Sequence, residues 1–541
     1  MSDSTSRFRT FIAAYEAEVA PLHREYNEAS WRFNLTGDPD DERASAELDT
    51  RIRTLLARPE SYRELNAIDA AGGIDDPLLA RQLKLLLNEH RAHQITPERI
   101  QPMVRLEKAL ESRFNNFRAE LDGARVSDNR IKDILRDTND LPLRRRAWEA
   151  SKQVGAGVAP DLLALVRLRN EAAHELGFAN YYSMMLMLDE LDEAELFALL
   201  DTLDQATQPL WREYKGALDA RLSRRFGIAV AELRPWHYAD PFFQEAPPAG
   251  VSLDRWFADI PLEDLARRYF EAVGFDIRDL LARADLYEKP GKCQHAFCMC
   301  VDRGRDIRVL CNLRPDERWM STLLHELGHA IYDAAIDPAL PYVLRSHAHI
   351  LTTEASAMLF GRVSRNAEWL ATWAGMPAAE ARATTDALAR ATRAQLLVQT
   401  RWELVMCHME RALYRDPEQD LRALWWDLVE RFQWVKRPEG RDAPDWAAKI
   451  HFSVAPCYYH NYQLGEMLAS QLQDHLLRSV LGGGAQVWGR YVRAPEVGAY
   501  LRREFYGPGK RFDWRELTRR ATGRTLESRP FVDELAGRAL A

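Results

Sequence analysis

The chain has 541 residues, with 73 basic against 81 acidic side chains and a formal net charge of -8. Because 46% of the residues are hydrophobic and 10% aromatic, it can bury a large core, which excludes a disordered protein. The negative charge repels nucleic-acid phosphates and anionic lipid, so we expect neither nucleic acid nor a membrane as a partner. Small molecules or peptides are the partners that this composition favours.

The N-terminal residues 1–11 are polar and contain no hydrophobic signal-peptide region. No stretch of the chain approaches the roughly 18 to 20 uncharged apolar residues that a membrane span requires. The sequence therefore predicts a cytoplasmic protein, and it leaves the oligomeric state open.

Helical periodicity dominates the chain. From about residue 8 to residue 220, apolar residues recur at i, i+3, i+4 and i+7 between polar linkers. Residues 296–301 (AFCMCV) and 307–313 (IRVLCNL) differ, because two apolar runs separated by a short segment with a turn glycine predict a β-hairpin. Helices resume at about Asp316 and continue to the end. The predicted fold class is mainly α.

An HELGH motif at residues 325–329 lies in the apolar, helically spaced stretch 321–335. A helix turns about once every 3.6 residues, so His325 and His329 project from one face and can reach one zinc ion. Neutral imidazoles suit zinc, and an adjacent carboxylate can take a proton from the metal's water. We predict His325 and His329 as ligands of one Zn²⁺ per chain and Glu326 as the general base.

A catalytic zinc needs a third protein ligand and an open position for water. Residues 350–362 (ILTTEASAMLFGR) predict a second helix, on which Glu354 stands among apolar and small residues. An unpaired carboxylate would be costly to bury there, and a metal ion removes that cost. We predict Glu354 as the third ligand. The alternative interpretation is a solvated carboxylate on the helix surface.

These motifs resemble the gluzincin peptidases, and more narrowly the group of angiotensin-converting enzyme, thimet oligopeptidase and oligopeptidase F. Residues 28–34 (EASWRFN) resemble the early helix of the converting-enzyme family, and residues 293–311 resemble its segment of cysteine, histidine, strand, turn and strand. Leu344-Arg345 stands nine residues before Glu354, as the corresponding pair does in that family.

The resemblance implies a two-lobed, helical, zincin-like metallopeptidase with a deep central channel and a small β-hairpin next to the active site. It implies a single peptidase domain over residues 1–541. In that domain an N-terminal helical lobe and lid, about residues 1–290, would precede a catalytic zinc half, about residues 291–541.

A polar and aromatic cluster follows Lys449 and includes tyrosines that share a face if the segment is helical. The resemblance implies that His451 and Tyr462 stabilise the oxyanion of peptide hydrolysis. It also implies that Lys449 and Tyr459 hold the C-terminal carboxylate of the substrate. The tyrosines lie one position later relative to His451 than in the converting enzyme, so the choice between Tyr458 and Tyr459 stays open. The alternative interpretation is that the tyrosines only pack in the core.

The hairpin gains a role from the same resemblance, which implies that His295 contacts the substrate. A strand edge that follows this histidine, at Ala296 and its neighbours, can pair with an extended peptide through main-chain hydrogen bonds. Peptides of varied sequence are then expected to bind.

Three positions depart from the family pattern. Asn461 stands where the converting enzyme has a chloride-linked arginine. Met358 replaces the acid that usually supports a metal ligand, so that support must come from elsewhere. The glutamine that helps to hold the substrate carboxylate has no clear match in residues 234–243 (RPWHYADPFF).

The predicted function is zinc-dependent hydrolysis of short peptides, in the manner of a dipeptidyl carboxypeptidase, because Lys449 offers a cation to a free C-terminus. The close alternative is an oligoendopeptidase like thimet oligopeptidase or oligopeptidase F. The third alternative is a catalytically silent relative that binds peptides, against which the intact Glu326 argues.

Overall fold

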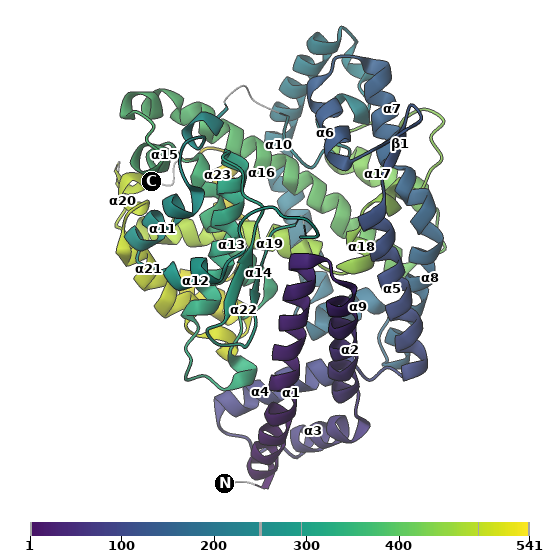
Figure 1. Ribbon diagram of the computed structural model, residues 1–541, viewed down its shortest axis with the longest axis vertical. Coiled ribbons are helices and arrows are strands. Elements are labelled where there is room, and N and C mark those ends of the chain that lie inside the picture. Colours follow the sequence, from purple (N-terminus) through teal and green to yellow (C-terminus); the bar gives the residue numbers. More distant parts are fainter. Residues whose placement is uncertain (1–2, 248–251, 294, 485, 539–541) are drawn as a thin grey trace. The chain divides into compact units, whose positions relative to one another are not determined.

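The computed structural model describes residues 3–247, 252–293, 295–484 and 486–538 (Figure 1). The chain folds as two compact units. Unit 1 comprises Met1–Gln94, Val251–Thr392 and Leu464–Ala541, and unit 2 comprises Ile95–Gly250 and Arg393–Gln463. Unit 1 takes chain from both sides of residue 290, so the units do not follow the two lobes predicted along the sequence, and those lobes stay a prediction.

The prediction of a mainly α fold is confirmed, since 71% of the structure is helical. The described part of unit 1 contains α1 (Asp3–Thr36), α2 (Pro39–Leu56), α3 (Pro59–Ala71), α4 (Pro77–Ala92), α11 (Leu262–Ala272), α12 (Arg278–Arg283), α13 (Glu317–Ala335), α14 (Ile350–Gly361), α15 (Ala367–Trp373), α20 (Val487–Tyr491), α21 (Pro495–Leu501), α22 (Trp514–Thr522) and α23 (Arg529–Leu535). Unit 2 contains α5 (Pro97–Asn116), α6 (Asp128–Asp137), α7 (Leu141–Ser151), α8 (Gln153–Glu175), α9 (Tyr181–Leu188), α10 (Glu193–Phe226), α17 (Leu421–Gln433) and α18 (His451–Val454). Helices α16 (Ala378–Arg415) and α19 (Tyr459–His475) include residues of both units.

Two antiparallel hairpins complete the described fold. The predicted hairpin is confirmed as β3 (Phe297–Cys300) paired with β4 (Ile307–Leu310), in a register that sets Phe297 opposite Leu310. The second hairpin, β1 (Ala119–Leu121) with β2 (Ala124–Val126), was not predicted. Its strands of three residues are too short to show an alternating pattern.

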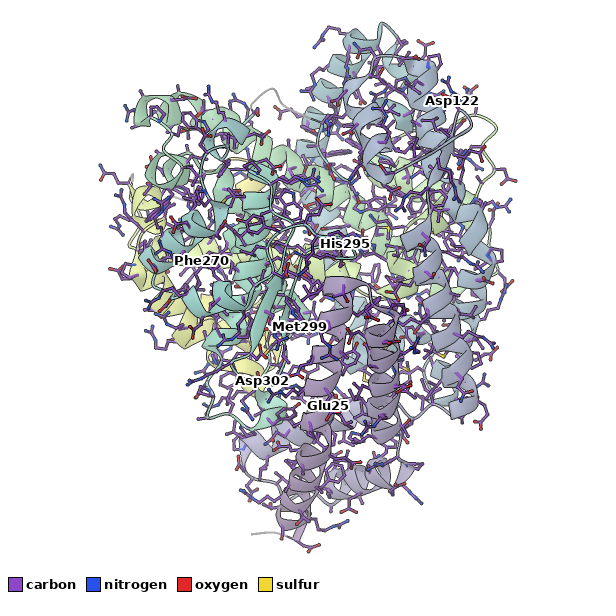
Figure 2. All side chains as sticks on the ribbon, in the orientation of Figure 1. Glu25, Asp122, Phe270, His295, Met299 and Asp302 are labelled. Carbon is purple, nitrogen blue, oxygen red and sulfur yellow. The ribbon has the colours of Figure 1, made fainter. Side chains whose placement is uncertain are left out.

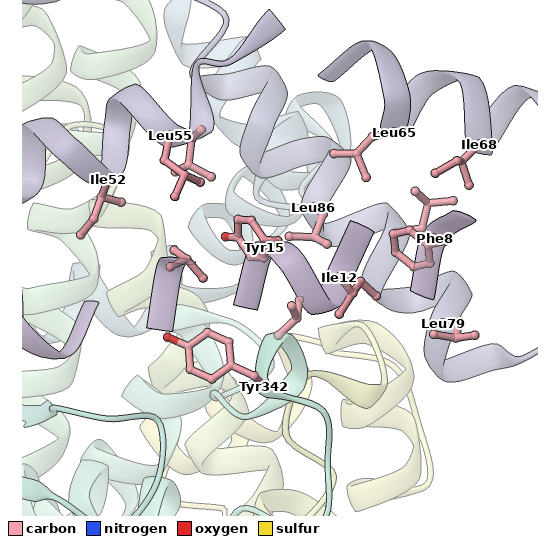
Figure 3. Close-up of a cluster of buried hydrophobic side chains, with 14 of the residues drawn as sticks. Phe8, Ile12, Tyr15, Ile52, Leu55, Leu65, Ile68, Leu79, Leu86 and Tyr342 are labelled. Carbon is pink, nitrogen blue, oxygen red and sulfur yellow. The ribbon is translucent and has the colours of Figure 1, made fainter. Parts of the chain in front are cut away.

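The N-terminal helices of unit 1 pack around a strictly spaced apolar face of α1. Phe8, Ile12, Tyr15, Val19 and Leu22 are all buried, at alternating steps of four and three residues along the helix. They meet apolar side chains of α2, α3 and α4 in one cluster, which Figure 3 shows. Burial of apolar surface therefore contributes to the stability of this part of unit 1.

Helices α13 and α14 approach unusually closely at Gly328. A Cβ atom at this position would lie 2.7 Å from the Cα of Ala357 and 3.0 Å from the carbonyl oxygen of Ser356. The glycine within the HELGH motif thus lets the two backbones pack side by side. That contact places the side chains of α13 opposite those of α14.

Replacing Gly328 by alanine should lower the free energy of unfolding by about 1–3 kcal/mol, because overpacking against backbone outweighs the better helix propensity of alanine. Gly216→Ala in α10 is the matched control, since no atom lies within 4 Å of its added Cβ, and it should stabilise the protein by about 0.5–1 kcal/mol. Urea unfolding of the zinc-free variants, followed by circular dichroism, measures both changes. Unchanged stability of Gly328→Ala would show that α13 and α14 do not approach this closely.

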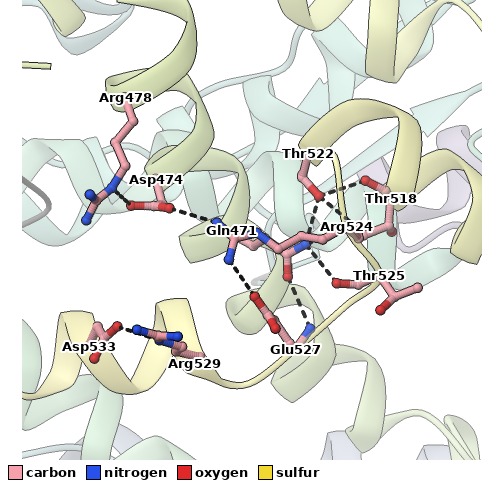
Figure 4. A network of polar contacts seen from close by, with 10 residues as sticks. All are labelled: Gln471, Asp474, Arg478, Thr518, Thr522, Arg524, Thr525, Glu527, Arg529 and Asp533. Carbon is pink, nitrogen blue, oxygen red and sulfur yellow. Dashed lines mark hydrogen bonds and ion pairs between the residues drawn. The ribbon is translucent and has the colours of Figure 1, made fainter. Parts of the chain in front are cut away.

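Polar contacts fix the C-terminal half of α19 within unit 1 (Figure 4). The side-chain amide of Gln471 donates to the hydroxyl of Thr522 at 2.7 Å and to the carbonyl oxygen of Thr525 at 3.0 Å, and its oxygen accepts from the N–H of Glu527 at 3.1 Å. The side chains of Gln471 and Thr522 are buried. The helix therefore has a defined position in the unit that also contains α14.

None of the helices in the described part of the chain has the length and the apolar character needed to cross a lipid bilayer.

Candidate metal centre

Helix α13 carries the two histidines of the predicted site. Its N-terminus is capped by Asp316, whose carboxylate accepts from the N–H of Trp319, so the helix begins where the sequence predicted. The rings of His325 and His329 lie 4.9 Å apart, centroid to centroid, at 85° to one another. The i, i+4 spacing thus places both imidazoles on one face.

Helix α14 brings Glu354 to these histidines. Its Oε2 lies 3.8 Å from Nε2 of His325 and 4.0 Å from Nε2 of His329. One donor atom from each of the three residues falls within 4.8 Å of the others. We call these three residues the metal triad. Glu354 is only 4% exposed, so the alternative of a solvated surface carboxylate is wrong.

The metal triad fits a zinc ion in geometry and in charge state. Zinc bonds of about 2.0–2.2 Å in a tetrahedron set neighbouring donors about 3.3–3.6 Å apart. The two histidine–glutamate distances, 3.8 and 4.0 Å, lie within about 0.7 Å of this spacing. Burial lowers the pKa of His325 to about 4. Burial, and next the neighbouring His325, lower the pKa of His329 well below its usual range. Both imidazoles are therefore neutral at pH 7 and have a lone pair for a cation.

Met358 has no acid group that could accept a hydrogen bond from a ligand, and the hydroxyl of Thr353 provides such a partner for His329. The Nδ1 atom of His329 lies 2.7 Å from the hydroxyl oxygen of Thr353, the residue before Glu354. Donation from Nδ1–H to this hydroxyl leaves the lone pair on Nε2, which faces the triad. Helix α14 thus supplies one predicted ligand, Glu354, and the hydroxyl of Thr353, which orients the ligand His329.

A glycine on α19 makes room for the carboxylate ligand. A Cβ atom at Gly465 would lie 2.8 Å from the Cβ of Glu354. The backbone of α19 at Gly465 therefore packs directly against the side chain of Glu354. The rotamers open to the carboxylate are restricted accordingly.

Glu326 lies beside the triad and is 7% exposed. Burial, and next the charge of Glu354, raise its pKa to about 8. A carboxyl group with a pKa near the working pH is suited to take up and return a proton.

His295 and Ala296 immediately precede β3, and His295 is exposed (Figure 2). One side of β4 pairs with β3, and its other side forms a bridge to Asp285 through Leu310. In the described part of the chain β3 is therefore the outer strand of its sheet. The side-chain amide of Asn27 on α1 donates to the carbonyl oxygen of Val301 at 3.0 Å, just beyond the strand. Among the described residues β3 therefore has a strand on one side only, and the roles of His295 and Ala296 stay predictions.

Unit 2 contains a second group of predicted site residues around Lys449. The ammonium of Lys449 donates to Oε1 of Gln244 at 2.8 Å and lies 5.3 Å from the centre of a Trp402 ring. The indole N–H of Trp402 donates to the hydroxyl oxygen of Tyr459 at 3.2 Å. We call Gln244, Trp402, Lys449 and Tyr459 the anchor group. Burial lowers the pKa of Lys449 to about 8, so the side chain is still mainly charged at pH 7.

His451 and Tyr462 also lie in unit 2. The ring of Tyr459 is 4.8 Å from that of His451 and 5.5 Å from that of Tyr462, centroid to centroid. Tyr459 and Tyr462 both belong to α19, which agrees with the predicted i, i+3 relation. Tyr458 also contacts Tyr462, at 5.1 Å between ring centroids, so the choice between Tyr458 and Tyr459 and the roles of His451 and Tyr462 stay predictions.

Gln244 is the site residue that the sequence analysis missed. It stands one position after the segment 234–243 in which a glutamine was sought. It lies in a loop without helical or strand periodicity, so only its proximity to Lys449 identifies it. The segment 234–243 itself contains no glutamine, and the glutamine that contacts Lys449 lies one position beyond it.

Comparison with known proteins relates these observations to a family. Residues 2–235 match the family model described as angiotensin-converting enzyme. The predicted resemblance to the angiotensin-converting enzyme family is confirmed. The metal triad lies beyond the matched residues, so its interpretation depends on its own geometry.

The chain is also similar to an inactive angiotensin-converting enzyme-related protein of Caenorhabditis elegans. The two are 20% identical over 578 aligned positions, which cover 97% of this chain and 62% of the relative. The chain thus spans about three-fifths of the length of that relative.

Proposed function

We propose that this protein is a zinc peptidase that hydrolyses short peptides. The observation that carries the proposal is the meeting of His325, His329 and Glu354 from two helices, with the buried Glu326 beside them. Family resemblance to angiotensin-converting enzyme supports the same reaction class. The relative from Caenorhabditis elegans is named inactive, and that description belongs to that protein.

The metal triad would hold one zinc ion, which lowers the pKa of a water molecule and polarises a carbonyl group. Glu326 takes the proton of the attacking water and gives it to the leaving amine. Thr353 keeps His329 in the tautomer that leaves Nε2 free to coordinate. Under this proposal His451 and Tyr462 donate to the oxyanion that develops on the scissile carbonyl.

We further propose a dipeptidyl carboxypeptidase mode, in which the anchor group binds the free C-terminus of the peptide. Lys449 supplies the cation, while the amide of Gln244 and the hydroxyl of Tyr459 supply hydrogen bonds. Gln244 provides the glutamine that the family resemblance implies.

Amidation of the C-terminus should lower kcat/KM about 10- to 100-fold, because a hydrogen bond to a charged group contributes about 1.5–3 kcal/mol. Lys449→Met should lower kcat/KM for the free-acid peptide to a similar extent and leave the amidated peptide unaffected. Lys436→Met is the matched control, since this exposed lysine of unit 2 lies outside the anchor group. Product analysis by mass spectrometry measures all three.

Two outcomes separate the alternatives. Equal cleavage of free-acid and amidated peptides, at internal bonds, would replace the carboxypeptidase mode by an oligoendopeptidase. Absence of hydrolysis by zinc-loaded protein across a mixed peptide library would favour a silent peptide-binding relative. Release of C-terminal dipeptides from free-acid substrates supports the proposed mode.

A further inference from the structure

The loop that carries Gln244 has no regular secondary structure of its own. It follows a short 3-10 turn at Pro235–His237 and runs through residues 238–247. Phe243, immediately before Gln244, has a φ of 53°, in the left-handed region that side chains other than glycine rarely adopt. Contacts from the rest of unit 2 must therefore hold this loop in place.

Asp240 supplies the central contact. Its side chain is buried, and one carboxylate oxygen accepts from the N–H of Phe242 at 2.8 Å. The other oxygen accepts from the N–H groups of Gln244 and Glu245, both at 2.9 Å. The loop thus wraps around a carboxylate that fixes the backbone of Gln244 directly.

Two glutamines of unit 2 hold the same loop from outside. The side-chain amide of Gln433 donates to the carbonyl oxygens of Phe242 at 3.1 Å and Phe243 at 2.9 Å. The side-chain oxygen of Gln395 accepts from the N–H of Ala246 at 2.9 Å. With the backbone held on both sides, the side chain of Gln244 is presented to Lys449.

We propose that Asp240 is a positioning residue for the anchor group and that it determines selectivity for peptides with a free C-terminal carboxylate. This inference rests on the proposed carboxypeptidase mode. Asp240 acts through Gln244 and does not touch the substrate. Its negative charge also favours the charged form of Lys449.

Asp240→Asn is the discriminating variant. It keeps the size of the side chain but offers one oxygen where the loop needs two. The NH₂ group of asparagine must then face either the N–H of Phe242 or the N–H groups of Gln244 and Glu245, and it cannot accept a hydrogen bond from them. The loop should shift, and the hydrogen bond from Lys449 to Gln244 should weaken.

Binding is measured by calorimetry on the full chain carrying Glu326→Gln, so that peptides are not cleaved. The probes are acetyl-pentaalanine with a free C-terminus and the same peptide amidated. We expect the background protein to bind the free acid about 30-fold more tightly, and Asp240→Asn to reduce this ratio to about 3 or less by weakening free-acid binding. Asp420→Asn is the matched control, because this exposed aspartate of unit 2 also accepts two backbone N–H groups, and it should leave the ratio unchanged.

An unchanged ratio in a folded Asp240→Asn protein overturns the inference and leaves the proposed function intact. A background protein that binds both peptides equally overturns the carboxypeptidase mode, and the inference with it. If Asp240→Asn does not fold, Gln433→Met removes the two contacts to the loop carbonyls and should reduce the ratio by about 3-fold or more. A folded Gln433→Met protein with an undiminished ratio overturns the inference as well.

Discussion

Glu326→Gln should reduce peptide hydrolysis by roughly a hundred- to ten-thousand-fold, the usual contribution of a general base. Glutamine is nearly the same size but cannot accept the proton of the attacking water. The expected loss is in kcat, with little change in KM, because Glu326 acts mainly in the transition state. Steady-state assays with zinc-loaded protein at pH 7 measure it.

Zinc content is the internal control for this variant. Glu326 is not a member of the metal triad, so Glu326→Gln should keep one zinc per chain. If the variant keeps its zinc and hydrolyses peptides at the wild-type rate, Glu326 is not the general base. A variant that loses zinc would instead place Glu326 among the ligands.

Glu354→Ala should weaken zinc binding by more than about a hundredfold, since removal of groups that only orient a ligand already costs 10- to 100-fold. Competition with a fluorescent chelator measures the change in Kd. Zinc should also stabilise the wild-type protein against unfolding, by about 4 kcal/mol at a thousandfold excess over Kd. The variant should show little of this stabilisation.

Glu410→Gln is the matched control for Glu354→Ala, because Glu410 is an equally buried carboxylate in unit 2, outside the metal triad. It should leave the zinc Kd unchanged. Equal zinc affinity in Glu354→Ala and in the wild type would show that Glu354 is not a zinc ligand and that the metal triad is wrong.

Local periodicity explains what the sequence predicted correctly. The HELGH motif lies on a helix because apolar residues recur around it at helical spacing, and α13 spans Glu317–Ala335. Glu354 was predicted on a second helix for the same reason, and α14 spans Ile350–Gly361. Residues 336–349 connect the two helices, so spacing predicted that each ligand lies on a helix, whereas the meeting of the two faces is a property of the folded chain.

Long-range packing explains what the sequence did not predict. Gln244 and Lys449 are separated by 205 positions and meet only in the folded chain. Thr353 supports His329 through a hydroxyl, which has no motif of its own. The two units are assembled from separate segments of the chain, and periodicity within a helix contains no information on such an assembly.

Anomalous X-ray diffraction at the zinc edge, from crystals of zinc-loaded protein, tests the central claim most directly. The account predicts one peak per chain, about 2.0–2.2 Å from a nitrogen of His325, a nitrogen of His329 and a carboxylate oxygen of Glu354. A map without a peak at these residues, or a metal ion from which Glu354 points away, would contradict it.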